Sequence, residues 1–120
     1  MTQNIFALVL AAGQSRRYGA TKLLEEFGGR PLVQHALAAS QEACPGRVCL
    51  VTGHASEDIA KASIGLADQI VLNDNYESGI GSSIAKGISY LFEDAASVIV
   101  LLADQPLVTA AHLKELVKRW

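Results

Sequence analysis

Glycine, arginine and lysine gather in a short segment that directly follows an apolar run near the start of the chain. Gly13 lets the backbone approach a ligand closely, and backbone N–H groups in such a loop can cradle phosphate oxygens. Arg16 and Arg17 offer forked donors for phosphate, and Lys22 offers a compact positive charge. These residue types suit a triphosphate, although their spacing matches neither the Walker P-loop nor the dinucleotide fingerprint. The alternative is a surface loop with solvated basic side chains.

A second segment places a carboxylate at the end of the most apolar run of the sequence, residues 98–103. Asp104 follows this run and comes before Gln105 and Pro106. A carboxylate is a hard ligand that suits Mg²⁺, which usually keeps several waters and bridges to substrate phosphates. Pro106 would stiffen the turn and fix the direction of Asp104. Because Asp and Pro are common in turns, an ordinary strand-ending turn is the alternative.

The third segment, residues 73–83, is polar and rich in glycine and serine. It is expected to be a loop that runs into the N-terminus of a helix, where free N–H groups and a partial positive charge favour anions. Ser82 and Ser83 would either contact a nucleotide or cap this helix. The spacing of the three histidines supports no Ser-His-Asp or Cys-His arrangement.

Apolar runs and helical periodicities alternate along the chain, and they place all three segments at strand ends. The apolar runs are continuous, as in strands buried on both faces, and alternation with helices predicts a parallel sheet covered on both sides. In such sheets, ligands bind beyond the carboxyl ends of the strands. A loop is expected from Ala12 to about Arg30. The expected strands are 5–10, 48–52, 68–72 and 98–103, and the expected helices are 31–43, 56–63, a stretch through 84–92, and 109–120.

The composition excludes several classes of protein. Half of the 120 residues are apolar and the net charge is -2, which argues against a disordered chain, a nucleic-acid binder or a membrane-bound protein. Cys44 and Cys49 fit no metal or redox spacing, and no secretory leader is evident, so we expect a reducing, cytoplasmic compartment. The length argues for one domain. Trp120 would end the last helix on its apolar stripe, which favours the front part of a longer protein.

Taken in order, the three segments resemble the motifs of MobA-like NTP transferases, and the two later ones resemble the molybdenum cofactor cytidylyltransferase branch. The first motif by itself is shared with many sugar-nucleotide and isoprenoid-pathway nucleotidyltransferases. It comprises Leu10, Ala11, Ala12, Gly13, Ser15, Arg17, Gly19 and Lys22. The later motifs comprise Asn73, Gly79, Gly81, Ser83 and Asp104-Gln105-Pro106.

This resemblance implies an α/β fold of the nucleotide-diphospho-sugar transferase type, with a three-layer Rossmann-like sheet of mostly parallel strands. It implies transfer of a cytidylyl group from CTP to a molybdopterin-type cofactor, with release of pyrophosphate. Arg17 and Lys22 would bind the phosphates and Asp104 would bind Mg²⁺, and these three are the expected catalytic residues. The expected nucleotide-binding residues are Leu10, Ala11, Ala12, Gly13, Ser15, Arg17, Lys22, Asn73, Gly81, Ser82 and Ser83.

Ala12 bears on the choice of base, because guanylyl-transferring relatives typically have glycine at the matching position. The implied partners are CTP, a molybdopterin-type acceptor, and a molybdoenzyme or its maturation factor. Family members usually continue beyond the Asp-Gln-Pro motif, so residues 1–120 are expected to be a single nucleotidyltransferase domain that forms the N-terminal portion of a longer one. The alternatives are use of GTP or of another acceptor such as a sugar phosphate, a non-catalytic nucleotide-binding module, and a protein without a ligand.

Overall fold

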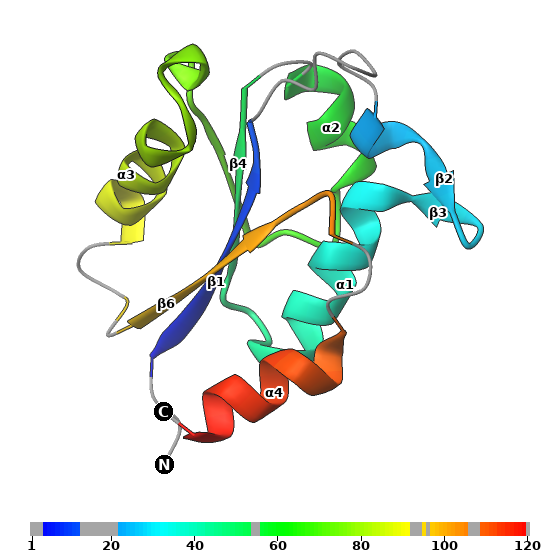
Figure 1. The fold of residues 1–120 in the computed structure, drawn as a ribbon, viewed down its shortest axis with the longest axis vertical. Helices are drawn as coiled ribbons and strands as arrows, with labels where there is room; N and C mark the ends of the chain where they lie inside the picture. The colour runs from blue at the N-terminus through cyan, green and yellow to red at the C-terminus, as the bar shows by residue number, and fades with distance from the viewer. Residues whose placement is uncertain are drawn as a thin grey trace.

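A parallel sheet forms the middle layer of the molecule (Figure 1). The computed structural model describes residues 4–12, 22–53, 56–91, 95, 97–105 and 109–119. Within these residues the sheet has the strand order β5-β4-β1-β6, and every neighbouring pair is parallel. The prediction of a parallel α/β sheet is therefore confirmed. Its strands are β1 (Ile5–Ala11), β4 (Val48–Thr52), β5 (Gln69–Leu72) and β6 (Ser97–Leu102).

Helices cover both faces of this sheet. Helix α3 lies on one side of it, and α1, α2 and α4 lie on the other (Figure 1). No helix among the described residues is long and apolar enough to cross a membrane. The helices are α1 (Leu32–Ala43), α2 (Ser56–Ala62), α3 (Ile80–Leu91) and α4 (Ala110–Arg119).

The central strand β1 is buried on both faces, as its unbroken apolar run predicts. Val9 packs in the core on the side of α1, together with Val33. Leu8, which points the opposite way, packs in the second core with Leu91 of α3. Strand β4 is also buried throughout. These two strands carry the double-sided core of the molecule.

The two outer strands are less buried than their apolar sequences predict. In β6, which lies at one edge of the sheet, Val100 is 43% exposed. In β5, at the other edge, only Val71 is buried. The expectation of full burial is therefore wrong for both, because an apolar run does not reveal the position of its strand within the sheet.

The segment between β1 and α1 contains structure that the sequence did not predict. A short 3-10 helix, η1, covers Lys22–Leu24, and strands β2 (Glu26–Phe27) and β3 (Arg30–Pro31) form a small hairpin. The Nε2–H group of His35 donates to the backbone oxygen of Phe27, which ties the hairpin to α1. Pro31 therefore lies in β3 and precedes the helix, rather than being its first residue.

Helix α3 begins earlier than predicted, and this changes the setting of the third segment. Residues Tyr76–Ser78 form the 3-10 helix η2, and Gly79 adopts a positive φ of 107° that suits glycine. Helix α3 then starts at Ile80, so that Gly81, Ser82 and Ser83 belong to its first turn and not to the preceding loop. The remaining predicted bounds agree with the structure to within two residues, apart from those near Phe92 and Trp120, which lie outside the described residues.

Candidate functional site

The carboxyl ends of the four parallel strands meet at one edge of the sheet. Ala12 follows β1, Gly53 follows β4, Asn73 follows β5, and Ala103 and Asp104 follow β6. The strands are in register there, because Ala11 pairs with Thr52, Thr52 with Leu72, and Leu10 with Leu102. The structure therefore brings the described parts of all three segments to the same edge. Their roles in binding remain predictions.

Asp104 lies next to the start of the first segment. Leu10 pairs with Leu102, and the Ala103 N–H donates to the Leu10 carbonyl at 3.0 Å, which continues the ladder to the end of both strands. Asp104 is the next residue, and Ala12 holds the corresponding place after β1. The Asp104 side chain is exposed. A carboxylate at this position is accessible to a ligand that occupies the edge.

The acidic groups at this edge suit a metal that is held largely by its substrate. Among the described residues, no group of three or more His, Cys, Asp or Glu side chains is placed to hold a metal ion. Mg²⁺ is usually bound in proteins by one or two carboxylates, waters and substrate phosphates. Asp104 is a donor of this kind, so it would suit a divalent cation whose other ligands are waters and substrate phosphates.

The first segment offers its backbone to this edge. Leu10, Ala11 and Ala12 are 6%, 1% and 1% exposed, because their side chains belong to the core. Contact with a ligand at these positions would therefore come from main-chain groups. The predicted residues Gly13, Ser15 and Arg17 lie outside the described residues. Lys22 begins η1, and its side chain also lies outside what the structure describes.

Asn73 is the centre of a hydrogen-bonded cluster at the end of β5. Its side chain is buried, and its Nδ2 group donates to Ser82 Oγ and to Ser83 Oγ, both at 3.0 Å. Its Oδ1 accepts the N–H of Asn75 at 3.0 Å. Its own backbone N–H donates to the Thr52 carbonyl at 2.7 Å. The structure thus brings together three of the predicted residues.

The two serines of this cluster bond to protein groups. Ser82 Oγ lies 2.7 Å from the Gly79 carbonyl oxygen and 3.1 Å from that of Asn75, and it can donate its hydrogen to either. Ser83 is buried, with 3% of its surface exposed. Gly81 is exposed, and a Cβ atom built there would meet nothing within 4 Å. In this cluster, Gly81 is therefore the predicted residue with open space beside it.

Gly53 and Tyr76 also shape this edge, although neither is among the residues predicted for the site. A Cβ atom at Gly53 would lie 2.8 Å from Cβ and Cγ of Tyr76, so the ring is seated where a side chain would otherwise be. Tyr76 also packs against the core beneath α3. The signal available in the sequence was a glycine directly after a buried strand, which can mark a close approach by another part of the chain.

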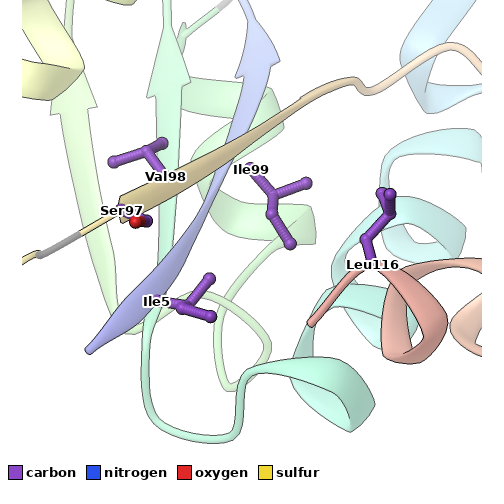
Figure 2. A pocket seen from close by; sticks show the side chains of 5 residues that line it. All are labelled: Ile5, Ser97, Val98, Ile99 and Leu116. Carbon is purple, nitrogen blue, oxygen red and sulfur yellow. The ribbon is translucent and has the colours of Figure 1, made fainter. Parts of the chain in front are cut away.

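Two other features have no part in this site. Burial raises the pKa of the Cys49 thiol to about 11. Burial also raises the pKa of the Cys44 thiol, although the positive charge of Arg47 lowers it in part. Neither cysteine is therefore an activated nucleophile. A cavity of about 500 Å³ lies at the opposite end of the strands, where β1 and β6 begin. Figure 2 shows its lining, which is apolar apart from Ser97, includes Ile5 and Leu116, and offers no titratable group.

Comparison with known proteins places this arrangement among nucleotidyltransferases. Residues 7–120 match the model of the MobA-like NTP transferase domain. The bifunctional protein GlmU of Stenotrophomonas maltophilia is 32% identical over 118 residues, which cover 97% of this chain and 26% of GlmU. The chain thus spans about a quarter of the length of the curated relatives it matches.

Solved structures share the fold. Rv0371c from Mycobacterium tuberculosis superposes with a TM-score of 0.82 at 24% identity, over 98% of this chain and 60% of that one, and a second structure of Rv0371c is a complex with manganese. A CMP:2-keto-3-deoxy-manno-octonic acid synthetase in complex with CTP superposes with a TM-score of 0.75 at 19% identity, over 98% and 47% of the two chains. These likenesses confirm the predicted nucleotide-diphospho-sugar transferase type of fold.

Proposed function

We propose that this chain, which belongs to the MobA-like NTP transferase domain family, takes part in the transfer of a cytidylyl group from CTP to the terminal phosphate of a molybdopterin-type cofactor. The observation that carries the proposal is the pairing of β1 with β6, which brings the strand ends that Ala12 and Asp104 follow to the same carboxyl edge of the sheet. The choice of cytosine and of the molybdopterin acceptor is supported by the resemblance of the three motifs, including alanine at position 12.

The reaction needs little covalent chemistry from the protein. An oxygen of the acceptor phosphate attacks the α-phosphorus of CTP, the bond between the α-phosphorus and the bridging oxygen breaks, and pyrophosphate leaves with that oxygen. Such a transfer depends on positioning and on stabilising the charge of the leaving group. The buried, high-pKa thiols of this chain fit a mechanism without a cysteine nucleophile.

The expected catalytic residues and the backbone of the first segment have these roles in the proposal. The main chain at Ala12 and Gly13 lines the nucleotide, and Arg17 and Lys22 hold its phosphates. Asp104 holds a divalent cation, which when bound would neutralise charge on the phosphate oxygens. Asp104 lies at the exposed end of β6, where water and phosphate can complete the coordination of such an ion.

A sugar acceptor is the second candidate. The resemblance in fold to a synthetase whose name specifies a sugar acid and whose structure contains CTP favours it. The first motif of this chain is also one that sugar-nucleotide transferases share. In that reading the same edge binds the nucleotide, and only the acceptor differs.

Titration and turnover together test the proposal. The chain is titrated calorimetrically with CTP and then with GTP, each with and without Mg²⁺, and pyrophosphate release is then measured with molybdopterin or with a sugar phosphate as acceptor. The proposal expects Mg²⁺-dependent binding that prefers CTP, and release of pyrophosphate with molybdopterin. Release with the sugar phosphate alone would establish the second candidate, and binding without release would indicate a non-catalytic module.

A matched pair of variants tests the assignment of Asp104. Asp104→Asn removes the carboxylate at the site, and Asp58→Asn removes an exposed carboxylate from the first turn of α2. We expect Asp104→Asn to lose the Mg²⁺-dependent part of CTP binding and Asp58→Asn to keep it. Equal behaviour of the two variants would remove Asp104 from the metal site.

A further inference from the structure

The side chain of Asn73 joins the sheet to the start of α3 and has little capacity left for a ligand. Both of its N–H donors are used, one by Ser82 Oγ and one by Ser83 Oγ. Its oxygen accepts the Asn75 N–H, and only 3% of the residue is exposed. A buried amide engaged in this way does not present its hydrogen-bonding groups to the open edge of the sheet.

We propose that Asn73 is a positioning residue, which holds the first turn of α3 at the carboxyl edge by acting through Ser82 and Ser83 and does not itself contact the nucleotide. This inference rests on the proposed function, because the nucleotide is what the turn would be positioned for. It changes the role that the motif resemblance implies for Asn73, and it keeps that residue essential to binding.

The position of Asn73 in the chain gives it this role. Its backbone N–H donates to the Thr52 carbonyl, so its main chain continues the ladder between β4 and β5. Its side chain meanwhile bonds to residues in the first turn of α3, nine and ten positions further along. One residue is therefore hydrogen-bonded both to the sheet and to α3, and the helix cannot shift relative to the sheet edge without breaking these bonds.

The loop between Asn73 and α3 is fixed at a second point. The Tyr76 ring occupies the space beside Gly53, at the end of β4. Ser78 Oγ donates to Asn75 Oδ1, and the Gly79 N–H donates to the Tyr76 carbonyl. These contacts shape the loop itself, whereas the Asn73 bonds are the side-chain link that leads directly from the sheet to the helix.

The hydrogen bonds of Asn73 position the open surface beside Gly81. Gly81 lies in the first turn of α3 and is exposed, and a Cβ atom there would meet no other part of the described structure within 4 Å, apart from its chain neighbours and the nearby backbone of its own helix. Backbone groups there can approach a ligand closely. Loss of the Asn73 bonds would let this turn sample other positions. The apparent affinity for the nucleotide would then be multiplied by the fraction of molecules in which the turn stays in place. If one molecule in ten keeps it, apparent Kd rises about tenfold.

The experiment measures the link and its consequence separately. Hydrogen exchange of the backbone amides of residues 80–84 is followed in the nucleotide-free protein, and the Kd for CTP with Mg²⁺ is measured by calorimetry. We expect Asn73→Ala to speed exchange in this turn and to weaken CTP binding about tenfold. Ser83→Ala, a milder change, should do both to a smaller extent. The double variant should be no worse than Asn73→Ala, because both changes remove the same link.

Two control variants separate positioning from a general loss of stability. Val71→Ala truncates a buried side chain in β5 without touching the link, and should lower the unfolding temperature while leaving CTP affinity unchanged well below that temperature. Asp74→Ala changes an exposed residue of the same loop that has no part in these contacts, and it should leave exchange in residues 80–84 unchanged.

The inference is overturned if Asn73→Ala weakens CTP binding with no change in exchange, because that result indicates direct contact. It is also overturned if exchange speeds up and affinity stays the same. If the unaltered protein binds neither CTP nor GTP, the proposed function itself fails and the positioning role falls with it. Exchange in residues 80–84 would then still report whether Asn73 holds the helix, which distinguishes the two failures.

Discussion

Two glycines of α3 should respond in opposite directions to the same substitution. Gly87 is buried, and a Cβ atom there would collide with Cδ1 of Leu8 and lie 3.0 Å from its Cδ2. Gly81, in the first turn of the same helix, has nothing within 4 Å of its Cβ position. Neither glycine has a positive φ, so alanine is compatible with the backbone at both positions. The pair therefore isolates the effect of packing against the sheet.

The magnitudes follow from two opposing effects. Replacing glycine by alanine within a helix gains up to about 1 kcal/mol, because the unfolded chain loses freedom. Forcing an extra methyl group into a packed core costs about 1–3 kcal/mol. Leu8 is fully buried and has little room to move aside. Gly87→Ala should therefore lower the free energy of unfolding by up to about 2 kcal/mol, and Gly81→Ala should raise it by a few tenths, since first-turn positions contribute less.

Urea unfolding followed by circular dichroism measures both changes, and the slope with denaturant should stay constant if only stability has changed. A third variant, Leu8→Val, shortens the side chain that the new methyl group would meet. In a double-mutant cycle, Leu8→Val should reduce the cost of Gly87→Ala. If Gly87→Ala proves as stable as the unaltered protein, or if the cycle shows no coupling, the close packing of α3 on β1 is refuted.

Three further changes test other contacts. Gly53→Ala should destabilise the protein by about 1–3 kcal/mol, because its Cβ would lie 2.8 Å from the Tyr76 side chain. The loop after β5 should also be cleaved faster by proteases. Unchanged stability would show that the Tyr76 ring can move aside freely. Asp68→Ala should cost about 1–3 kcal/mol in thermal unfolding, because Asp68 Oδ2 accepts the Val48 N–H at 2.9 Å; Asp68→Asn, which keeps an acceptor, should cost less. The thiol of Cys49 has its pKa raised from 9.0 to about 11 by burial, so the folded state holds this proton more tightly than the unfolded state. Stability should therefore be intact below pH 9 and fall as pH rises from 9 to 11, and Cys49→Ala should flatten this dependence in denaturant titrations at each pH.

The inner strands β1 and β4 were predictable because burial on both faces leaves a simple mark in the sequence, an unbroken apolar run. The run Val48–Thr52 was predicted with its observed bounds, since Gly53 follows it directly and ends the apolar run. The β2–β3 hairpin escaped prediction because its strands have two residues each, too few to show alternation. The edge position of β6 escaped for a different reason, since strand order depends on pairing between distant segments.

The candidate site was predictable in position and less so in detail. Parallel strands end together, so the strand ends alone placed Ala12, Asn73 and Asp104 at one edge. The start of α3 was misplaced because glycines and serines favour loops locally, whereas the hydrogen bonds from Asn73 hold them in a helical turn. The packing of Tyr76 against Gly53 brings together two segments that are distant in the sequence, and no local sequence pattern predicts such a contact.

The central place of β1 has a consequence for how the protein is made. A ribosome delivers β1 first and its partner β4 soon afterwards, but β6, which pairs with the other edge of β1, is made only after β5 and α3. Until then the nascent chain carries an apolar strand with no charge and no proline along one open edge, the kind of template that pairs with other chains. A product that stopped before residue 97 would lack β6 and keep this edge of β1 open, so we expect it to aggregate instead of folding.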